Sequence, residues 1–372
     1  MWLQHALGAG SSKQTRILSN YKTLRDFYSA GREAWLLEGY FTQKEIYKLS
    51  SYSVSDAEAL VQYCNKIGQR ILTPESKTYP ELLRQIPNPP CVLYVKGKLP
   101  DFESCLSISI VGTRKATDAG KTAARSFAFG LAKQGVTVVS GGALGIDTAA
   151  HKGALQAGGE TVCVLGCGID VNYLMANAEL RETIAAKGAL ISEYPPSTQA
   201  TGSNFPIRNR IISGLSLGTL VVEAAAKSGS LITADYALDQ GRDVFAVPSG
   251  IYNPVGKGVN SLIKSGAKPV SGVNEILEEY TERYPGKFHL DDTQINVIIE
   301  ESKIKNEPVK KEPLYDVSSN AQKLFSYMTD KPEHISKLCK LSGLRIAEAL
   351  SAVTELEIAG EIKSYPGSRY SI

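Results

Sequence analysis

The most distinctive chemical feature of this 372-residue sequence is the glycine-rich stretch Ser140-Gly141-Gly142-Ala143-Leu144-Gly145-Ile146-Asp147. It follows an apolar, strand-like run and opens a helix-like segment. Glycines allow a tight turn with exposed amide groups, and the N-terminus of the next helix adds partial positive charge. Ser140, Gly141, Gly142 and Gly145 are therefore predicted to form an anion site, most naturally for a phosphate. The alternative is that the glycines only permit close packing of a helix on a strand.

The same stretch argues against two nucleotide-binding classes and shows no catalytic set. It is not the GxGxxG dinucleotide fingerprint, and GxxxxGK[ST] does not occur. His151 follows Asp147 by one helical turn, a spacing that acid–base chemistry could use. No nucleophile elbow, paired carboxylates or metal-ligand set accompanies these two residues. We therefore predict structural roles for Asp147 and His151, with no catalytic residue, metal ion or cofactor.

Basic side chains, an amide and an aromatic ring follow the carboxyl ends of other strand-like runs, where open α/β sheets bind ligands. They are Arg114, Phe205, Arg208, Asn209, Arg210 and Lys227. Cations for phosphates and a ring for stacking suit a nucleic-acid backbone. Each residue also has a plain alternative. Arg208 or Arg210 could form a structural ion pair, Phe205 could belong to the core, and Lys227 could be a solvated helix charge.

The apolar pattern between residues 107 and 247 predicts the strands and helices that would bring these residues together. Short runs rich in Val, Ile and Leu, with little alternation, are typical of strands covered on both faces. They alternate with helix-like segments, which predicts an α/β fold: an extended Rossmann-like, doubly wound, mostly parallel sheet. The predicted strands are 107–111, 136–140, 161–165, 189–193, 219–223 and 244–247, and the predicted helices are 119–134, 146–157, 178–187, 208–213 and 231–240.

Two smaller regions flank this core. Residues 1–73 have apolar positions at helical spacing, which predicts a small helical domain, and the prolines after Thr73 indicate a boundary, so the core is assigned to 74–284. Residues 285–316 have few apolar side chains and are predicted to be a linker. In 317–372 three helices precede a hairpin-like tail. This order is typical of a winged helix; a three-helix bundle is the alternative.

Composition limits the classes of function. The net charge is +3, and residues 317–372 carry seven basic and six acidic side chains, so any polyanion must be held by a local cluster. Six scattered cysteines without a CxxC pair indicate reduced thiols in a cytoplasmic protein. The sequence shows no secretory signal and no apolar run of roughly 18 residues, so no membrane association is expected.

Several motifs, in this order, resemble the DNA-processing protein A family (DprA, also called Smf). The matching stretches are Tyr79-Pro80, Ile110-Val111-Gly112-Thr113-Arg114, Ser140–Asp147 with His151, Ser192-Glu193-Tyr194-Pro195, Phe205–Ile212, Glu223–Ala234 and Gly241–Pro248. The resemblance covers about residues 74–275. It implies a SAM- or helix-hairpin-like N-terminal domain, a Rossmann-like core and a winged helix. It also implies no catalysis, binding of single-stranded DNA, a homodimer, and loading of the RecA recombinase onto DNA that is protected and processed during natural transformation.

Carried onto this sequence, the family's DNA pocket would include Arg114, the Ser140–Gly145 loop, Phe205, Arg208–Arg210 and Lys227. Two departures stand out. Family members often have a basic residue just ahead of Phe-Pro, and 201–203 supplies none, which removes one expected phosphate contact. The family's usual Tyr-Pro is replaced here by Tyr173-Leu174, which predicts a looser loop that does not touch the pocket.

Two further expectations remain. Leu262 and Ile263 are adjacent apolar residues in a polar surface region and are predicted to lie in the dimer interface; the alternative is that both pack inside the core. The second candidate function is a related Rossmann-class phosphoribohydrolase that cleaves nucleoside monophosphates. Its PGGxGTxxE motif has no full counterpart, because Leu217-Gly218-Thr219 precedes Glu223 without the paired glycines.

Overall fold

The computed structural model describes residues 1–288, 317–329 and 332–372. The chain divides into two compact units, residues 1–295 and 296–372. Most of the predicted linker, 289–316, lies outside the described residues.

A nine-stranded sheet forms the centre of the first unit. Its spatial order is β1-β2-β6-β5-β4-β3-β7-β8-β9. The seven strands from β6 to β9 in this order are parallel, whereas β2 runs antiparallel to both β1 and β6. The strand bounds are β1 Arg70–Leu72, β2 Leu93–Gly97, β3 Ser107–Val111, β4 Thr137–Ser140, β5 Thr161–Leu165, β6 Ala189–Ser192, β7 Gly218–Val221, β8 Asp243–Ala246 and β9 Lys268–Pro269. The predicted, mostly parallel α/β sheet is confirmed.

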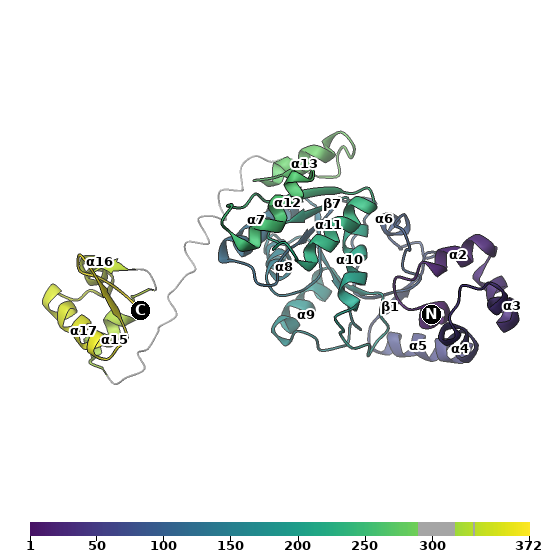
Figure 1. Ribbon diagram of the computed structural model, residues 1–372, viewed down its shortest axis with the longest axis horizontal. Helices are drawn as coiled ribbons and strands as arrows, with labels where there is room; N and C mark the ends of the chain where they lie inside the picture. The colour runs from purple at the N-terminus through teal and green to yellow at the C-terminus, as the bar shows by residue number, and fades with distance from the viewer. Residues whose placement is uncertain (289–316, 330–331) are drawn as a thin grey trace. The chain divides into compact units, whose positions relative to one another are not determined.

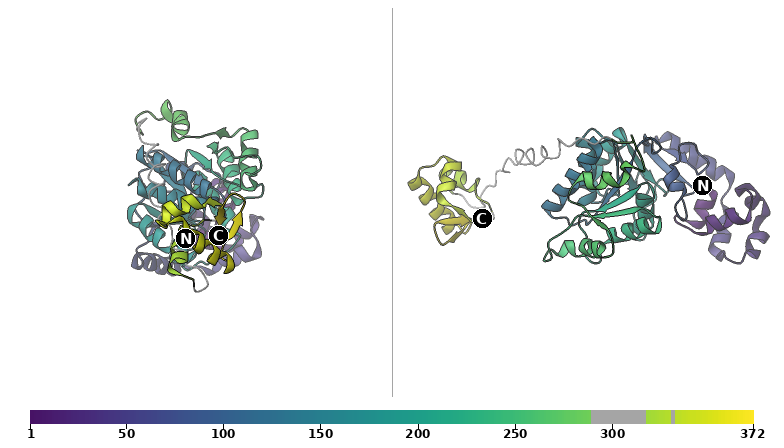
Figure 2. Two further views of the ribbon diagram at one scale, coloured as in Figure 1. Left: turned by 90° about the vertical axis from the view of Figure 1, so that its left-hand side faces the viewer. Right: turned by 90° about the horizontal axis from the view of Figure 1, so that it is seen from above.

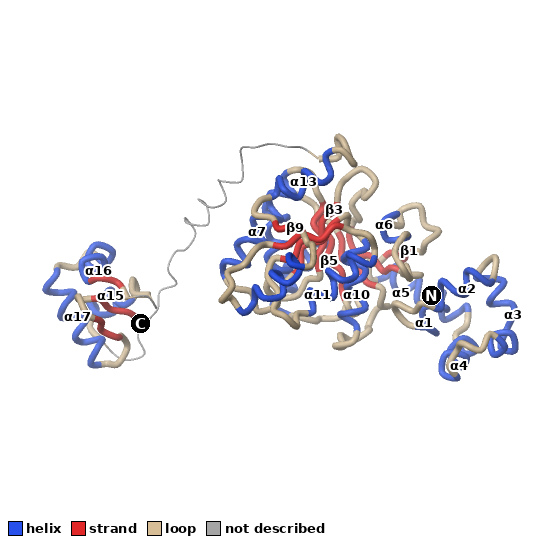
Figure 3. The backbone as a smooth tube through the Cα atoms, turned by 45° about the horizontal axis from the view of Figure 1, so that its top comes forward, coloured by secondary structure: helices blue, strands red, loops and turns tan. Residues whose placement is uncertain are grey.

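Helices cover both faces of this sheet (Figures 2 and 3). On one face Ile108 and Ile110 of β3 pack against α7, α8 and α13, and α9 covers the same side of β5. On the other face Val139 and Val162 share a core with α6, α10, α11 and α12. The bounds are α6 Glu81–Arg84, α7 Asp118–Lys133, α8 Ile146–Gln156, α9 Ala178–Lys187, α10 Asn204–Gly214, α11 Gly229–Asp239, α12 Lys257–Lys264 and α13 Val273–Thr281, with 3-10 turns η1 Met175–Asn177 and η2 Pro254–Gly256.

The chain reverses its direction of travel across the sheet between β3 and β7. From β3 it adds β4, β5 and β6 on one side, then returns to place β7, β8 and β9 on the other. The loops that leave β3 and β7 consequently diverge and open a crevice at the carboxyl edge of the sheet. In doubly wound folds this is where ligands bind.

Five helices precede the sheet and gather at its β1 end (Figure 1). They are α1 Trp2–Leu7, α2 Lys13–Asn20, α3 Leu24–Leu37, α4 Gln43–Ser51 and α5 Val54–Lys66. Phe27 and Trp35 lie in a core that α1 to α4 share, and Thr23, Thr42 and Ser53 cap α3, α4 and α5. The helical N-terminus is confirmed. The predicted boundary at 73 falls between β1 and its partner β2, although both strands belong to one sheet. Strand β1 has only three residues, too few to be recognised as a strand from the sequence.

In its described residues, 317–329 and 332–372, the second unit combines three helices with a three-stranded antiparallel sheet of order β10-β12-β11. Its elements are α15 Ser319–Phe325, β10 Glu333–His334, α16 Ile335–Ser342, α17 Ile346–Ile358, β11 Lys363–Tyr365 and β12 Arg369–Ser371. Gly343 ends α16 with φ of 67°, a left-handed conformation that glycine adopts readily. The hairpin of β11 and β12 is the wing, so the predicted winged helix is confirmed and the three-helix bundle is not.

Candidate nucleic-acid interface

A groove of about 460 Å³ opens at the crevice between the loops after β3 and β7. The loop after β4 and the first turns of α10 and α11 complete its walls. The residues that line it include Gly112, Thr113, Arg114, Ala143, Asp147, Phe205, Arg208, Asn209, Ser228, Gly229 and Ser230. Sequence segments separated by more than one hundred residues thus meet in one groove, as predicted from the strand ends.

Phe205 lies half-buried in the wall of this groove, in the first turn of α10. The Arg114 guanidinium carbon lies 5.0 Å from the centre of its ring, and that of Arg208 lies 5.9 Å away. The Tyr173 ring is 5.3 Å from Phe205 at an interplanar angle of 35°. A ring held beside cations and a second ring can stack on a base, and the exposed Arg114 can meet a phosphate next to it.

The contact with Tyr173 corrects the expectation that its loop does not touch the pocket. Tyr173 and Leu174 line a small hollow on the other side of Phe205, together with Arg114 and Gly142. Leu174 adopts φ of 57°, an uncommon conformation for a side chain of this kind. Asn177, for which the sequence predicted no role, donates from Nδ2 to the Gly142 carbonyl oxygen at 3.1 Å. This loop therefore braces the glycine loop.

Arg208 is buried, with 4% of its surface exposed, although it lines the groove. Its Nη1 donates to the Gly141 carbonyl oxygen at 2.8 Å and to that of Val164, while Nε has no partner among the residues that the structure describes. Burial lowers the pKa of this guanidinium. Arg208 thus fixes the glycine loop against β5 and supplies positive charge beneath it, without being a freely exposed cation.

Asp147 is the carboxylate nearest to this charge. It is buried in the first turn of α8, and its Oδ2 accepts from the Ala143 amide at 3.3 Å. Burial raises the Asp147 pKa to about 6, while Arg208 and the loop amides act in the opposite direction. The side chain stabilises the conformation of the glycine loop through this hydrogen bond, in agreement with the predicted structural role.

The sequence left two explanations for the glycines of this loop, a tight turn that exposes amides and close packing of a helix on a strand, and the structure shows features of both. Gly142 and Gly145 have φ of 69° and 85°, so the tight turn requires glycine. A side chain on Gly145 would collide with the Thr113 carbonyl oxygen, which shows that close packing also matters. Ser140 is fully buried and donates to the Ile110 carbonyl oxygen at 2.6 Å. It therefore lies outside the groove, contrary to the prediction.

Arg210 is a third correction. Its Nη2 lies 2.6 Å from Glu193 Oε2, and both side chains are buried. The Gly10 amide donates to the other Glu193 oxygen at 3.2 Å, so the N-terminal segment covers the pair. Two residues along a helix correspond to about 200° of rotation, which turns Arg210 away from the face that carries Arg208. The ion-pair alternative holds for this residue.

Asn209 and Lys227 occupy different places at the groove. Asn209 lines it and donates from Nδ2 to the Gly229 carbonyl oxygen at 3.2 Å, which ties α10 to the start of α11. Lys227 is exposed in the loop after β7, just before the lining residues Ser228–Ser230. It can reach a strand that leaves the groove but is not part of its wall.

Comparison with known proteins decides the family. Residues 70–281 match the family model described as DNA recombination-mediator protein A, and residues 308–368 match the DprA winged helix domain. The chain belongs to the DNA-processing protein A family. It is 35% identical to Protein Smf of Escherichia coli over 88% of this chain and 83% of that protein, and 43% identical to DNA processing protein DprA of Bacillus subtilis over 56% and 70%.

Two solved DprA structures are similar to the chain. That of DNA processing protein A from Streptococcus pneumoniae has a TM-score of 0.64 and 31% identity, covering 78% of this chain and 97% of that one. That of DNA processing protein A from Helicobacter pylori has a TM-score of 0.53 and 28% identity, covering 58% and 97%. The Helicobacter pylori protein is described as having a unique single-stranded DNA binding mode.

The two remaining titratable candidates, His151 and Glu223, both have hydrogen-bond partners inside the fold. His151 is fully buried, with Nδ1 2.8 Å from Thr161 Oγ1, and burial lowers its pKa to about 3. Glu223 accepts from the Thr117 amide at 2.9 Å and from its hydroxyl at 2.6 Å, and so fixes the start of α7. Within residues 1–288, 317–329 and 332–372 no group of three or more His, Cys, Asp or Glu could hold a metal ion.

The predicted dimer residues, Leu262 and Ile263, are half-buried on α12 and pack in part against the core beneath it. Both interpretations of this pair thus have a physical basis, and the interface stays a prediction. None of the helices in the described part of the chain is long and apolar enough to cross a membrane.

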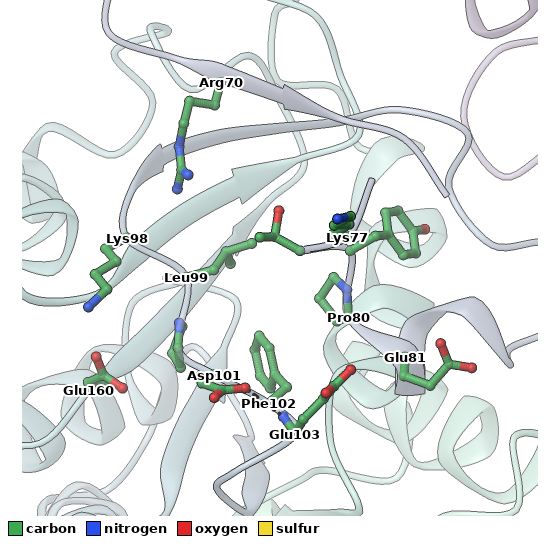
Figure 4. A pocket seen from close by; sticks show the side chains of 13 residues that line it. Arg70, Lys77, Pro80, Glu81, Lys98, Leu99, Asp101, Phe102, Glu103 and Glu160 are labelled. Carbon is green, nitrogen blue, oxygen red and sulfur yellow. Dashed lines mark hydrogen bonds between the residues drawn. The ribbon is translucent and has the colours of Figure 1, made fainter. Parts of the chain in front are cut away.

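A second hollow of about 510 Å³ lies at the opposite, amino edge of the parallel strands (Figure 4). Figure 4 shows Arg70 and Lys98 on one side and Asp101, Glu103 and Glu160 on the other. Three basic and four acidic side chains line it in all, so the hollow has no excess of positive charge to attract a polyanion. Despite its larger volume it is the weaker candidate for DNA.

Proposed function

We propose that the chain binds single-stranded DNA in the groove at the β3–β7 crevice. The arrangement that carries the proposal is the Phe205 ring, half-exposed at the groove with Arg114 beside it. A base that has left its stack can lie on this ring, and the guanidinium can meet its phosphate. Paired bases cannot reach the ring, so single strands are favoured.

Phosphates along the groove would meet three kinds of donor. Arg114 and Lys227 are exposed cations, and Asn209 adds an amide. The backbone at Gly141, Gly142 and Gly145 turns tightly before α8, whose N-terminus adds partial positive charge. Arg208 contributes from beneath this loop. Such contacts carry no base information, so we infer little sequence preference.

We further infer that the chain acts as a homodimer that loads the RecA recombinase onto the bound strand, as the family resemblance implies, and that it protects and processes incoming DNA during natural transformation. Leu262 and Ile263 on α12 are the proposed dimer contacts. Support for these steps comes from membership of a family described as a DNA recombination mediator.

We propose no catalytic activity. For the alternative phosphoribohydrolase, Glu223 would have to act on a sugar, but both of its oxygens already accept hydrogen bonds from Thr117. Gly218 lies inside β7, where a side chain would meet Phe245 and Tyr280, so it does not form a phosphate loop. Release of free base from nucleoside monophosphates would favour the enzyme instead.

A mobility-shift assay tests the proposed function. The purified chain is titrated into a labelled single strand and into the matching duplex, each with and without RecA. We expect tighter binding to the single strand and faster RecA assembly on strands that carry the protein. Equal binding to the duplex, or no effect on RecA, would contradict the corresponding part of the proposal.

A further inference from the structure

The loop between β8 and α12 presents two large apolar side chains to solvent. Ile251 is 74% exposed and Tyr252 is 92% exposed, adjacent to each other at its tip. Single exposed apolar residues are common on protein surfaces, whereas contiguous exposed apolar surface marks interaction sites, and these two side chains are adjacent. Neither the groove nor the proposed dimer contacts account for them.

Hydrogen bonds hold this loop in one conformation. Asn260 of α12 accepts from the Ser249 amide at 3.2 Å and donates to the Ser249 carbonyl oxygen at 2.9 Å. Asn253 donates to the Ser249 hydroxyl at 3.0 Å. The tip is therefore fixed to the helix behind it. Because the backbone on both sides of Tyr252 is already ordered, binding at the tip costs little backbone conformational entropy.

The loop lies at the same carboxyl edge of the sheet as the groove. It leaves β8, the neighbour of β7, and adjacent strands are about 4.8 Å apart. Where α12 begins, the Gly258 amide donates to the Ala224 carbonyl oxygen at 2.8 Å. The loop after β8 is thus joined to the loop that carries Lys227 and leads into the groove wall at Ser228.

Charge along this path suits a polyanion. Lys227 lies in the loop after β7, next to the groove-lining Ser228, and Lys257 follows the β8–α12 loop directly. Both are exposed, and neither forms an ion pair within the part of the chain that the structure describes. An aromatic ring flanked by free lysines at the end of a groove is the arrangement that sequence-tolerant single-strand binders use.

We propose that Tyr252 is a second base-stacking residue, which extends the DNA path from Phe205 across the β7 and β8 loops, with Lys227 and Lys257 on the phosphates between the two rings. This inference rests on the proposed function. The occupant of the Tyr252 surface is single-stranded nucleic acid. A second copy of the chain is the competing occupant, and the test separates them.

The test measures affinity against oligonucleotide length by fluorescence anisotropy of labelled oligothymidylates. Full-length wild type is compared with Tyr252→Ala, Tyr252→Phe, Phe205→Ala and the control Tyr47→Ala, which removes a 71% exposed tyrosine on α4. We expect Tyr252→Ala to weaken long oligonucleotides roughly 5- to 150-fold, the factor for one stacked base, and to leave the shortest binding length unchanged. Tyr252→Phe, which keeps the ring, and Tyr47→Ala should match wild type.

Each other outcome overturns the inference in a recognisable way. If Phe205→Ala weakens every length and Tyr252→Ala weakens none, the groove holds but Tyr252 is not part of the path. If neither variant weakens any length, the proposed function fails as well. If Tyr252→Ala lowers the sedimentation coefficient at unchanged affinity, the ring contacts a second copy and not DNA.

Discussion

Arg208 and Arg210 are two residues apart on α10, yet one lines the groove and the other is sealed in an ion pair with Glu193. The helix turns by about 200° between them. One helix therefore presents charge to the candidate DNA surface with one side and anchors the N-terminal segment with the other. The two arginines should respond differently to substitution.

Replacing Arg210 by Met should destabilise the fold and leave the salt dependence of DNA binding unchanged. The change leaves the Glu193 carboxylate buried without its partner, and breaking a buried pair typically costs about 3–5 kcal/mol. Urea unfolding measures this loss, with the exposed Arg125→Met as control, expected within about 0.5 kcal/mol of wild type. A variant of wild-type stability with a flatter salt slope would show that Arg210 contacts DNA phosphates and would contradict this prediction.

Replacing Lys227 by Ala should flatten the plot of the logarithm of affinity against the logarithm of salt concentration. One lost phosphate contact on a single strand removes about 0.7 from the slope, through counterion release. Affinity should fall alike for all sequences, because phosphate contacts carry no base information. Lys133→Ala, an exposed lysine at the end of α7, is the matched control. An unchanged slope in a folded Lys227→Ala protein would remove this residue from the DNA path.

Asp147 should make the fold less stable as pH rises from about 4 to 6. Its pKa is about 6 in the folded chain because it is buried, and about 3.9 when unfolded. The folded state binds the extra proton in this window, so stability is lost with a limiting slope of about 1.36 kcal/mol per pH unit. Denaturant unfolding at several pH values should show this slope in wild type and lose it in Asp147→Asn. Identical profiles would show that Asp147 is ionised throughout.

Replacing Ile263 by Asp should produce a folded monomer. The side chain is half-buried on α12, so a charge there can be solvated in the monomer but not between two copies. Sedimentation velocity gives the oligomeric state and circular dichroism the fold, with Ile263→Val expected to behave as wild type. A dimer that survives the substitution, or an unfolded chain, would contradict the proposed interface.

Much of the fold could be predicted because buried parallel strands leave continuous apolar runs. All six predicted strands, such as 161–165, occur in the sheet, and the predicted helix 178–187 has the bounds of α9. Beyond these six, β1 and β9 have only three and two residues, too few for an apolar pattern, and their pairing depends on neighbours distant in sequence. Helix α10 begins at Asn204, earlier than predicted, because Pro206 is compatible with a first helical turn.

The groove was harder to predict than the fold, since residue type does not reveal side-chain direction. Arg114 and Phe205 meet as expected. The burial of Ser140 and the pairing of Arg210 depend on packing partners that no local pattern shows. The two-residue spacing of Arg208 and Arg210 is a signal that could have separated them, because it places them on opposite faces of a helix. Asn177 braces the glycine loop from another segment and carried no sequence signal.

The central claim is that a base stacks on Phe205, and the affinity of Phe205→Ala for a short single strand tests it most directly. Fluorescence anisotropy at several salt concentrations gives affinity and slope together. The account predicts a loss of roughly 1–3 kcal/mol in binding free energy with an almost unchanged salt slope, because a ring is removed and no phosphate contact is lost. Wild-type affinity in a folded Phe205→Ala protein would contradict it.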